Sequence, residues 1–209
     1  MTIALARVPR KDAAENREAL LASARIVLNA DPSASLEAIA AHASLSRRSV
    51  YGHFANRDEL VRELLAAGSA RVALALDGVD HPDPVVRLAI IASRLWREVA
   101  DVRVMAVLAV RGPLKVHTAT ALAPLRASVR AAIAVAIECG SIRTDIPVER
   151  LARLVEDAAL SALEESERSR LDSADGHRLV MMMALGTVGL GWRECERIIE
   201  ITPELHWEG

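Results

Sequence analysis

Hydrophobic positions recur at helical spacing along almost the whole chain. From Glu18 to Asn29, apolar residues fall three or four positions apart, as on one face of an amphipathic helix. Leu36, Ile39, Ala40 and Ala43 repeat this spacing on a shorter segment. The alternation of apolar and polar residues that is typical of half-buried strands does not occur. The sequence therefore predicts an all-α fold.

Capping residues predict where the first helices begin. Ser35 is a good N-cap for a helix of about two turns, and Ser46 for a further short helix. Glu37, in the first turn after Ser35, suits the positive end of the helix dipole. Asn56 and Glu59 resemble a capping box that opens a longer helix. Short helices this close together predict a small N-terminal three-helix bundle.

The pattern changes after a turn-rich segment at 77–84. We expect Gly140 to end one of the later helices in the left-handed conformation. Gly186, Gly189 and Gly191 lie inside the last predicted helix, where we expect them to serve packing or a kink. The longer helices are expected at about 84–100, 102–111, 117–138, 147–170 and 174–201.

Composition excludes several classes of protein. Hydrophobic residues make up 52% of the 209, which argues against disorder, and the net charge of −2 indicates no partner. The longest uncharged run, at 179–192, is too short to span a bilayer. Cys139 and Cys195 stand alone, so we expect free thiols in a soluble, cytoplasmic protein. We expect no cofactor and no metal site, with His177 at the surface.

The most informative segment is residues 35–60, which predicts a helix, a short turn and a second short helix. This helix-turn-helix arrangement sets one helix into a DNA major groove. Leu45, Val50 and Phe54 can pack inward. The outward side chains are hydrogen-bond donors of the kinds that contact phosphates and base edges: Arg47, Arg48, Ser49, Tyr51 and His53. The absence of carboxylates from 38–57 suits a phosphate-facing surface, although 102–137 is also free of acids.

Residues 15–62 resemble the DNA-binding half of the TetR (tetracycline-repressor-like) family of transcriptional regulators. Two positions depart from the family pattern. Ser44 stands where glycine is usual, so its backbone must tolerate a strained or left-handed conformation, and Arg48 stands where glycine is frequent, which adds a charge to the helix that reads DNA. The matching residues are Ser35, Leu36, Ile39, Ala40, Ala43, Leu45, Ser46, Ser49, Val50, Tyr51, His53, Phe54, Asn56, Arg57 and Leu60.

The resemblance implies a transcriptional regulator with two domains, a DNA-binding domain at 1–62 and a helical effector-binding and dimerisation domain at 63–209. It further implies a homodimer on a pseudo-palindromic double-stranded DNA operator, acting as a repressor that a small molecule releases. The expected DNA-contacting residues are Ser35, Ser46, Arg47, Arg48, Ser49, Tyr51, His53 and Arg57.

Dimerisation has independent support in the sequence. The run from Leu179 to Leu185 is apolar around the whole helix, so it needs a second burial surface. The helix at 147–170 offers another apolar face, and the two helices predict a four-helix interface between two copies. The alternative is a core helix buried within one chain. The interface candidates are Leu151, Leu154, Val155, Ala158, Met182 and Met183.

An effector pocket is expected among methionine- and tryptophan-bearing helices, because methionine adapts to varied apolar ligands. The alternative for each of these residues is plain core. Basic residues at 102–137, such as Arg103, Arg111 and Arg126, either counter an anionic effector or form a solvated cationic face, and the second is favoured. The pocket candidates are Trp96, Met105, Leu108, Met181 and Met182.

Two other functional classes fit the sequence less well. An enzyme is not expected, since no glycine motif for phosphate binding lies between a strand and a helix, and neither cysteine has a histidine near it in sequence. A helical interaction scaffold would explain a bundle but not the Arg47-Arg48-Ser49-x-Tyr51 segment. Binding to duplex DNA, together with no activity in enzyme screens, would distinguish a transcriptional regulator from an enzyme and from an interaction scaffold.

Overall fold

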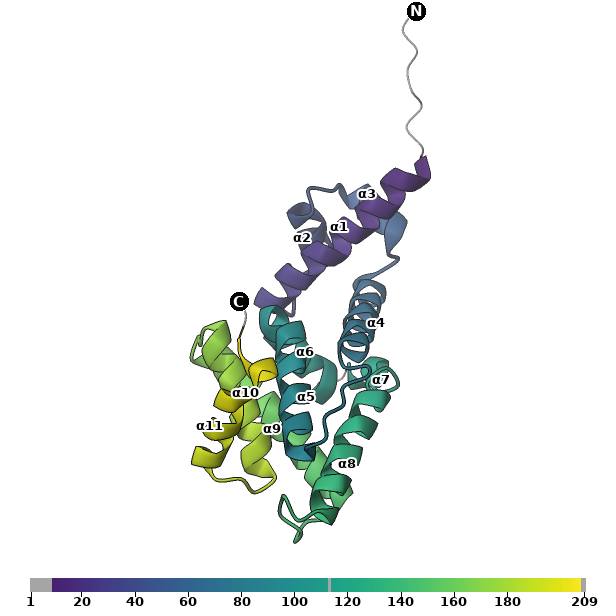
Figure 1. The fold of residues 1–209 in the computed structure, drawn as a ribbon. Helices are drawn as coiled ribbons and strands as arrows, with labels where there is room; N and C mark the ends of the chain where they lie inside the picture. The colour runs from purple at the N-terminus through teal and green to yellow at the C-terminus, as the bar shows by residue number, and fades with distance from the viewer. Residues whose placement is uncertain (1–8, 113, 208–209) are drawn as a thin grey trace, which may run out of the picture. The chain divides into compact units, whose positions relative to one another are not determined.

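The computed structural model describes residues 9–112 and 114–207, and every regular element among them is a helix (Figure 1). The all-α prediction is confirmed. The chain divides into two compact units, Met1–Ala67 and Gly68–Gly209. The division falls inside one helix, α4 (Arg57–Ala75), a few residues beyond the expected boundary at 62. Gly68 is therefore an interior residue of this helix at the division.

The first unit contains α1, α2, α3 and the first part of α4. Helix α1 begins before the expected Glu18. The residues before Glu18 are mostly polar and show no apolar periodicity, but their helix propensity is high enough to extend the helix. It packs against both α2 and α3. The bounds are α1 Pro9–Ala30, α2 Leu36–His42 and α3 Arg47–His53. The fully buried core side chains are Leu20, Ala24, Leu28, Ile39, Val50, Phe54 and Leu60.

The caps predicted for the first unit are present. The Ser35 hydroxyl accepts a hydrogen bond from the Ala38 N–H at 3.1 Å, and the Ser46 hydroxyl accepts from the Ser49 N–H at 3.1 Å. The Asn56 side chain accepts from the Glu59 N–H at 2.9 Å. The Glu59 carboxylate completes a reciprocal arrangement by accepting from the N–H of Ala55, at 2.7 Å.

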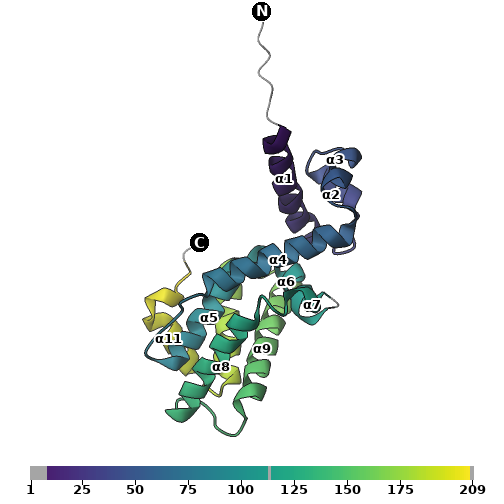
Figure 2. The same cartoon turned by 90° about the vertical axis from the view of Figure 1, so that its right-hand side faces the viewer.

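The second unit is a larger bundle of helices. Helix α10 packs against both α9 and α5, and α8 lies against α5 and α9 (Figure 2). Short 3₁₀ turns follow α5 and α11. The bounds are α5 Pro84–Val99, α6 Arg103–Arg111, α7 Lys115–Thr118, α8 Ala123–Glu138, α9 Val148–Arg168, α10 Ser173–Thr187 and α11 Trp192–Ile201.

Two of the predicted long helices are wrong, because each is divided. The segment 174–201 forms α10 and α11, separated where Gly189 takes a φ of 105°. The N–H groups of Gly189 and Leu190 then donate to the last carbonyls of α10, so the glycines end the helix rather than pack or kink it. The segment 117–138 contains α7 and α8, and Pro124 lies in the first turn of α8. Gly140 ends α8 in the left-handed conformation as predicted, with a φ of 69°.

The expectation of a surface position for His177 is also wrong. Its side chain is buried in the second unit, with Nε2 2.7 Å from the Ser93 hydroxyl and the ring 5.1 Å from the ring of Trp207. Burial, and after it the charge of Arg97, lowers the pKa of His177 to about 4, so the imidazole is neutral at physiological pH. His177 is therefore a core residue that joins α5, α10 and the C-terminal segment.

Candidate nucleic-acid interface

The turn between α2 and α3 is fixed by a residue in the left-handed conformation. Ser44 has a φ of 56°, as its place in the motif predicts. The N–H of Leu45 donates to the Ala40 carbonyl at 2.9 Å, and that of Ser44 to the Ala41 carbonyl at 3.0 Å. This double hydrogen bond satisfies the last carbonyls of α2. The chain can then enter α3 within three residues.

Helix α3 has a buried and an exposed face. Val50 is completely buried, and so is Phe54, directly after the helix. On the outer face the Arg47 side chain is 77% exposed and Arg48 is also exposed, with Tyr51 at 44%. The predicted Ser49 and His53 are half-buried, while Ser35 and Ser46 act as the caps of their helices. The structure thus brings most of the predicted DNA-contacting side chains to one short helix.

Glu37 also belongs to this surface, although the sequence indicated only a favourable interaction with the dipole of its helix. The Tyr51 hydroxyl donates to its carboxylate at 2.9 Å, and the Arg47 Nη2 lies 3.4 Å from the same oxygen. The Arg47 guanidinium also lies 5.6 Å from the centre of the Tyr51 ring. Three polar side chains of the exposed surface are therefore held together, across two helices.

Arg57 has a different environment from the one expected of a DNA contact. Its Nε donates to the Ala34 carbonyl at 2.8 Å, and its Nη2 donates to the Pro32 carbonyl. These bonds tie the start of α4 to the loop that precedes α2. Arg57 thereby supports the position of Ser35, and its contact with DNA remains a prediction.

Arg17 is a second brace that the sequence pattern did not indicate. From α1 its Nη1 donates to the His53 carbonyl at 2.8 Å, and its Nε donates to Glu63 of α4 at 3.0 Å. The guanidinium also lies 4.4 Å from the centre of the Phe54 ring. One side chain thus fastens the end of α3 to both long helices of the first unit. Its partners are distant in sequence, so spacing carries no signal for them.

Residues 20–64 match the family model described as "Bacterial regulatory proteins, tetR family". This segment contains the whole α2–turn–α3 arrangement. The N-terminal unit is therefore similar to the DNA-binding part of tetR-family regulatory proteins. Comparison of the sequence with curated proteins gives no significant match.

Solved structures of similar fold cover most of this chain and nearly all of their own length. The transcriptional regulator FadR from Bacillus subtilis, solved with stearoyl-CoA, has a TM-score of 0.65 at 12% identity, covering 80% of this chain and 97% of its own. The fatty acid degradation regulator FadR from Bacillus halodurans has a TM-score of 0.67 at 14% identity, covering 89% and 98%. SmeT, the repressor of a Stenotrophomonas maltophilia efflux pump, has a TM-score of 0.60 at 20% identity, covering 84% and 92%.

The predicted dimer residues divide into inward and outward positions. Leu151 and Val155 are buried in the second unit, and Ala158 and Met182 are half-buried. Leu154 is 40% exposed and Met183 39% exposed. Helix α10 contacts α5, α9 and α11, so most of its apolar surface is already covered within the chain. An interface between copies remains a prediction, and its exposed candidates are Leu154 and Met183.

The predicted effector residues lie mostly in the core of the second unit. Met105 and Met181 are buried, and Leu108 is half-buried. Trp96 is completely buried, and its Nε1 donates to the Ser173 carbonyl at 3.0 Å. Gly176 packs so closely on the indole that a Cβ there would lie 2.1 Å from it. A ligand contact by these residues remains a prediction.

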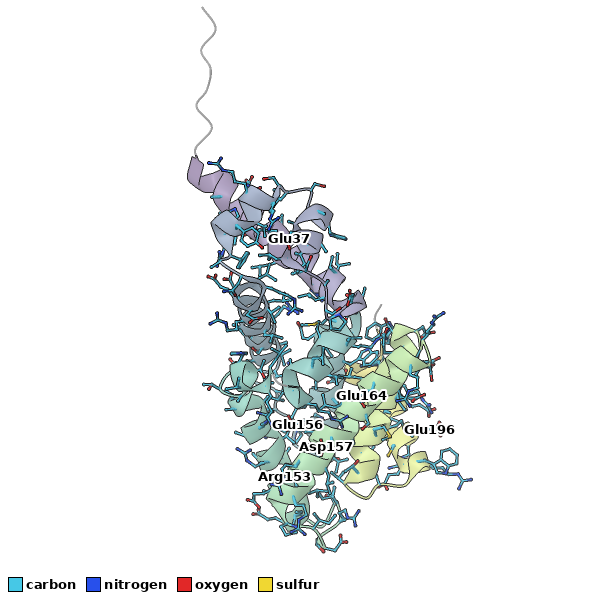
Figure 3. The ribbon with its side chains drawn as sticks, turned by 180° about the vertical axis from the view of Figure 1, so that it is seen from behind. Glu37, Arg153, Glu156, Asp157, Glu164 and Glu196 are labelled. Carbon is cyan, nitrogen blue, oxygen red and sulfur yellow. The ribbon has the colours of Figure 1, made fainter. Side chains whose placement is uncertain are left out.

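Three of the basic residues considered for an anionic effector are paired within the unit. Arg103 lies 3.1 Å from Glu167, and Arg111 lies 2.8 Å from Glu164. Arg126 is 2.7 Å from Glu156. Figure 3 shows the acidic partners Glu156 and Glu164 along α9. These ion pairs fasten α6 and α8 to α9, so the three arginines have carboxylate partners within the chain, and a role opposite an anionic effector remains a prediction.

A hollow of about 310 Å³ lies elsewhere in the second unit, between the end of α4, α5 and α8. Apolar side chains line it together with two aspartates and Arg87, whose Nε is buried without a hydrogen-bond partner. None of the predicted effector residues lines this hollow. Its lining consists of Ala73, Leu76, Asp77, Gly78, Val79, Asp80, Arg87, Pro124, Leu125 and Ser128.

Two further properties concern the described part of the chain. No helix at 9–112 or 114–207 has the length and apolar character needed to cross a membrane. Within the same ranges, no three His, Cys, Asp or Glu side chains gather as ligands for a metal ion would.

The left-handed conformation of Ser44 generates a prediction about stability. Because a side chain in this conformation costs about 1–2 kcal/mol that glycine avoids, Ser44→Gly should raise the free energy of unfolding in urea by about 1 kcal/mol. Ala43→Gly is the matched control, since Ala43 has a φ of −76° and gains nothing from glycine. The control should be destabilised by about 0.5–1 kcal/mol. A neutral or destabilising effect of Ser44→Gly would contradict the assignment.

Proposed function

We propose that this chain is a repressor that binds a pseudo-palindromic operator as a homodimer in the cytoplasm and is released by a small-molecule effector. One observation carries the DNA-binding part. Val50 and Phe54 are buried on one side of α3, while Arg47, Arg48 and Tyr51 are exposed on the other side. The exposed side is the one that can enter a major groove. The proposal assigns no catalytic activity to the chain.

A dimer determines the form of the operator. In a two-fold dimer of helix-turn-helix units, the recognition helices enter grooves about 34–36 Å apart, or a multiple of that spacing. The bound sequence then has two inverted half-sites, each read by one copy of α3. Selection of duplexes from a random library by the purified protein tests this directly. Enriched sequences without inverted symmetry would contradict the proposal.

Arg48 generates a prediction about sequence readout. It is exposed on α3, and an arginine there can donate two hydrogen bonds to a guanine edge. Arg48→Ala should weaken binding to the selected duplex by about 1–3 kcal/mol and relax the preference at one position of each half-site. The measurements are fluorescence anisotropy and a repeated selection with the variant.

The control for Arg48→Ala is Arg130→Ala, which removes an exposed arginine from α8 of the second unit. It should leave affinity and preference unchanged. If Arg48→Ala weakens binding to every duplex alike, Arg48 contacts phosphate instead of a base.

The exposed position of Leu154 generates a prediction about assembly. An arginine at the centre of an apolar interface would be buried without a partner, which costs several kcal/mol. Leu154→Arg should therefore convert a dimer to monomers in sedimentation velocity at micromolar concentration. Ile201→Arg is the matched control on α11, where Ile201 is 67% exposed. A wild-type monomer, or a variant that stays dimeric, would contradict an interface through α9.

The effector part of the proposal rests on the second unit and on relatives of the same fold. FadR from Bacillus subtilis was solved with stearoyl-CoA, and RolR, with a TM-score of 0.56, was solved with resorcinol. Stearoyl-CoA has a long acyl chain and resorcinol an aromatic ring, so each has an apolar portion that methionine-bearing helices could contact. We extend this to an apolar effector for the present chain. The ion pairs of Arg103, Arg111 and Arg126 give no support to an anionic one.

An effector should raise the Kd for the selected duplex by a coupling of about 5–150-fold. Stearoyl-CoA, resorcinol and related compounds with an apolar portion, including uncharged ones, are the first probes, with anisotropy as the measurement. If the predicted residues bind the effector, Met182→Ala should abolish the response. Leu125→Trp, which fills the hollow at α8, should then leave it intact. The reverse result would place the effector in the hollow, and no response to any probe would contradict the apolar class.

A further inference from the structure

Glu37 is the only acidic residue between Asp31 and Asp58, and it lies beside the recognition helix. Figure 3 shows it in the N-terminal unit. Its carboxylate accepts the hydrogen bond of the Tyr51 hydroxyl at 2.9 Å and lies 3.4 Å from the Arg47 guanidinium. The Glu37 carboxylate thus already pairs with Tyr51 and Arg47, two side chains that could otherwise donate hydrogen bonds to DNA.

The carboxylate is ionised at neutral pH. Its own backbone N–H, the Tyr51 hydroxyl and the charge of Arg47 together hold the pKa of Glu37 below its ordinary value. The anionic oxygen makes with Tyr51 and Arg47 the contacts that a phosphate oxygen would make. A phosphate approaching this edge of α3 therefore has to displace Glu37, and is repelled by it.

We propose that Glu37 is a specificity-determining residue that selectively weakens binding to arbitrary DNA. Phosphate contacts supply essentially all the affinity for non-specific duplexes. Because Tyr51 and Arg47 are paired with Glu37, they are not available for such phosphate contacts. On the operator, α3 also gains contacts to base edges, for which Glu37 holds Arg47 and Tyr51 in place. Glu37 therefore lowers the affinity for the operator less than it lowers the affinity for arbitrary DNA. This inference rests on the operator binding proposed above.

Glu37→Gln is the informative substitution, because it removes the charge and keeps an oxygen that can accept from Tyr51. Binding is measured by anisotropy, across a salt series, to the selected duplex and to a scrambled duplex of equal length. We expect the Kd for scrambled DNA to fall about tenfold and that for the selected duplex to change less than about threefold. The salt slope on scrambled DNA should steepen by about one, for one additional phosphate contact.

Two further variants separate this role from a general effect of charge or structure. Glu18→Gln makes the same change in net charge at an exposed position of α1, and should leave both Kd values nearly unchanged. In a Tyr51→Phe background, Glu37→Gln should increase non-specific affinity less, since the Tyr51 hydroxyl, which a neutral amide binds less strongly than a carboxylate does, is no longer present to donate to a phosphate. Circular dichroism and thermal unfolding show that each variant is folded.

The outcomes distinguish the inference from the proposed function. If the wild type does not discriminate between selected and scrambled duplexes, the operator-binding proposal fails, and this inference fails with it. If the wild type discriminates but Glu37→Gln shifts both Kd values equally, only the inference is overturned. It is also overturned if Glu18→Gln acts as strongly, because the effect is then one of net charge.

Discussion

The ends of helices impose the main constraint on this molecule. Each helix leaves up to four N–H groups at its start and four carbonyls at its end without partners inside the helix. In the N-terminal unit the starts of successive helices are satisfied by Ser35, Ser46 and Asn56. The ends of α2, α8, α9 and α10 are closed by residues in the left-handed conformation: Ser44, Gly140, Arg170 and Gly189. The length and direction of α2 and α3 depend on the few such residues in the N-terminal unit.

Because α2 and α3 have only seven residues each, their own hydrogen bonds cannot hold them in place. The structure compensates with two arginine braces from outside the motif. Arg57 holds the loop before α2, and Arg17 holds the carbonyl of His53 at the end of α3. The exposed side chains of α3 therefore project from a surface whose backbone is supported at both ends. A rigid support of this kind lowers the entropy cost of ordering side chains on DNA.

The features that the sequence predicted are local ones. Ser35 and Ser46 as caps, and Ser44 as a left-handed turn, depend on residues within a few positions, and short-range patterns describe them well. The features that it missed have distant partners. His177 is polar by type, yet Ser93 and Trp207, which enclose it, come from segments far away in the chain.

The site shows the same division between local and distant contacts. The motif indicated which side chains of α3 face outward. It did not indicate that Arg57 donates hydrogen bonds to backbone carbonyls 23 and 25 positions earlier. Nor did it indicate that Glu37 bonds to Tyr51, 14 positions later. The division of the last predicted helix at Gly189 was missed for another reason. Apolar periodicity continues through the turn, and only the left-handed glycine shows that the helix has ended.

Gly68 has a consequence for the mechanics of the chain. It lies in the interior of α4, where the two compact units meet, and a Cβ added there would touch nothing within 4 Å. Close packing therefore does not require glycine at this place, and glycine costs a helix about 1 kcal/mol relative to alanine. The glycine therefore lowers the helix propensity of α4 at the division between the two units, so local opening of the helix there costs less free energy than it would with alanine.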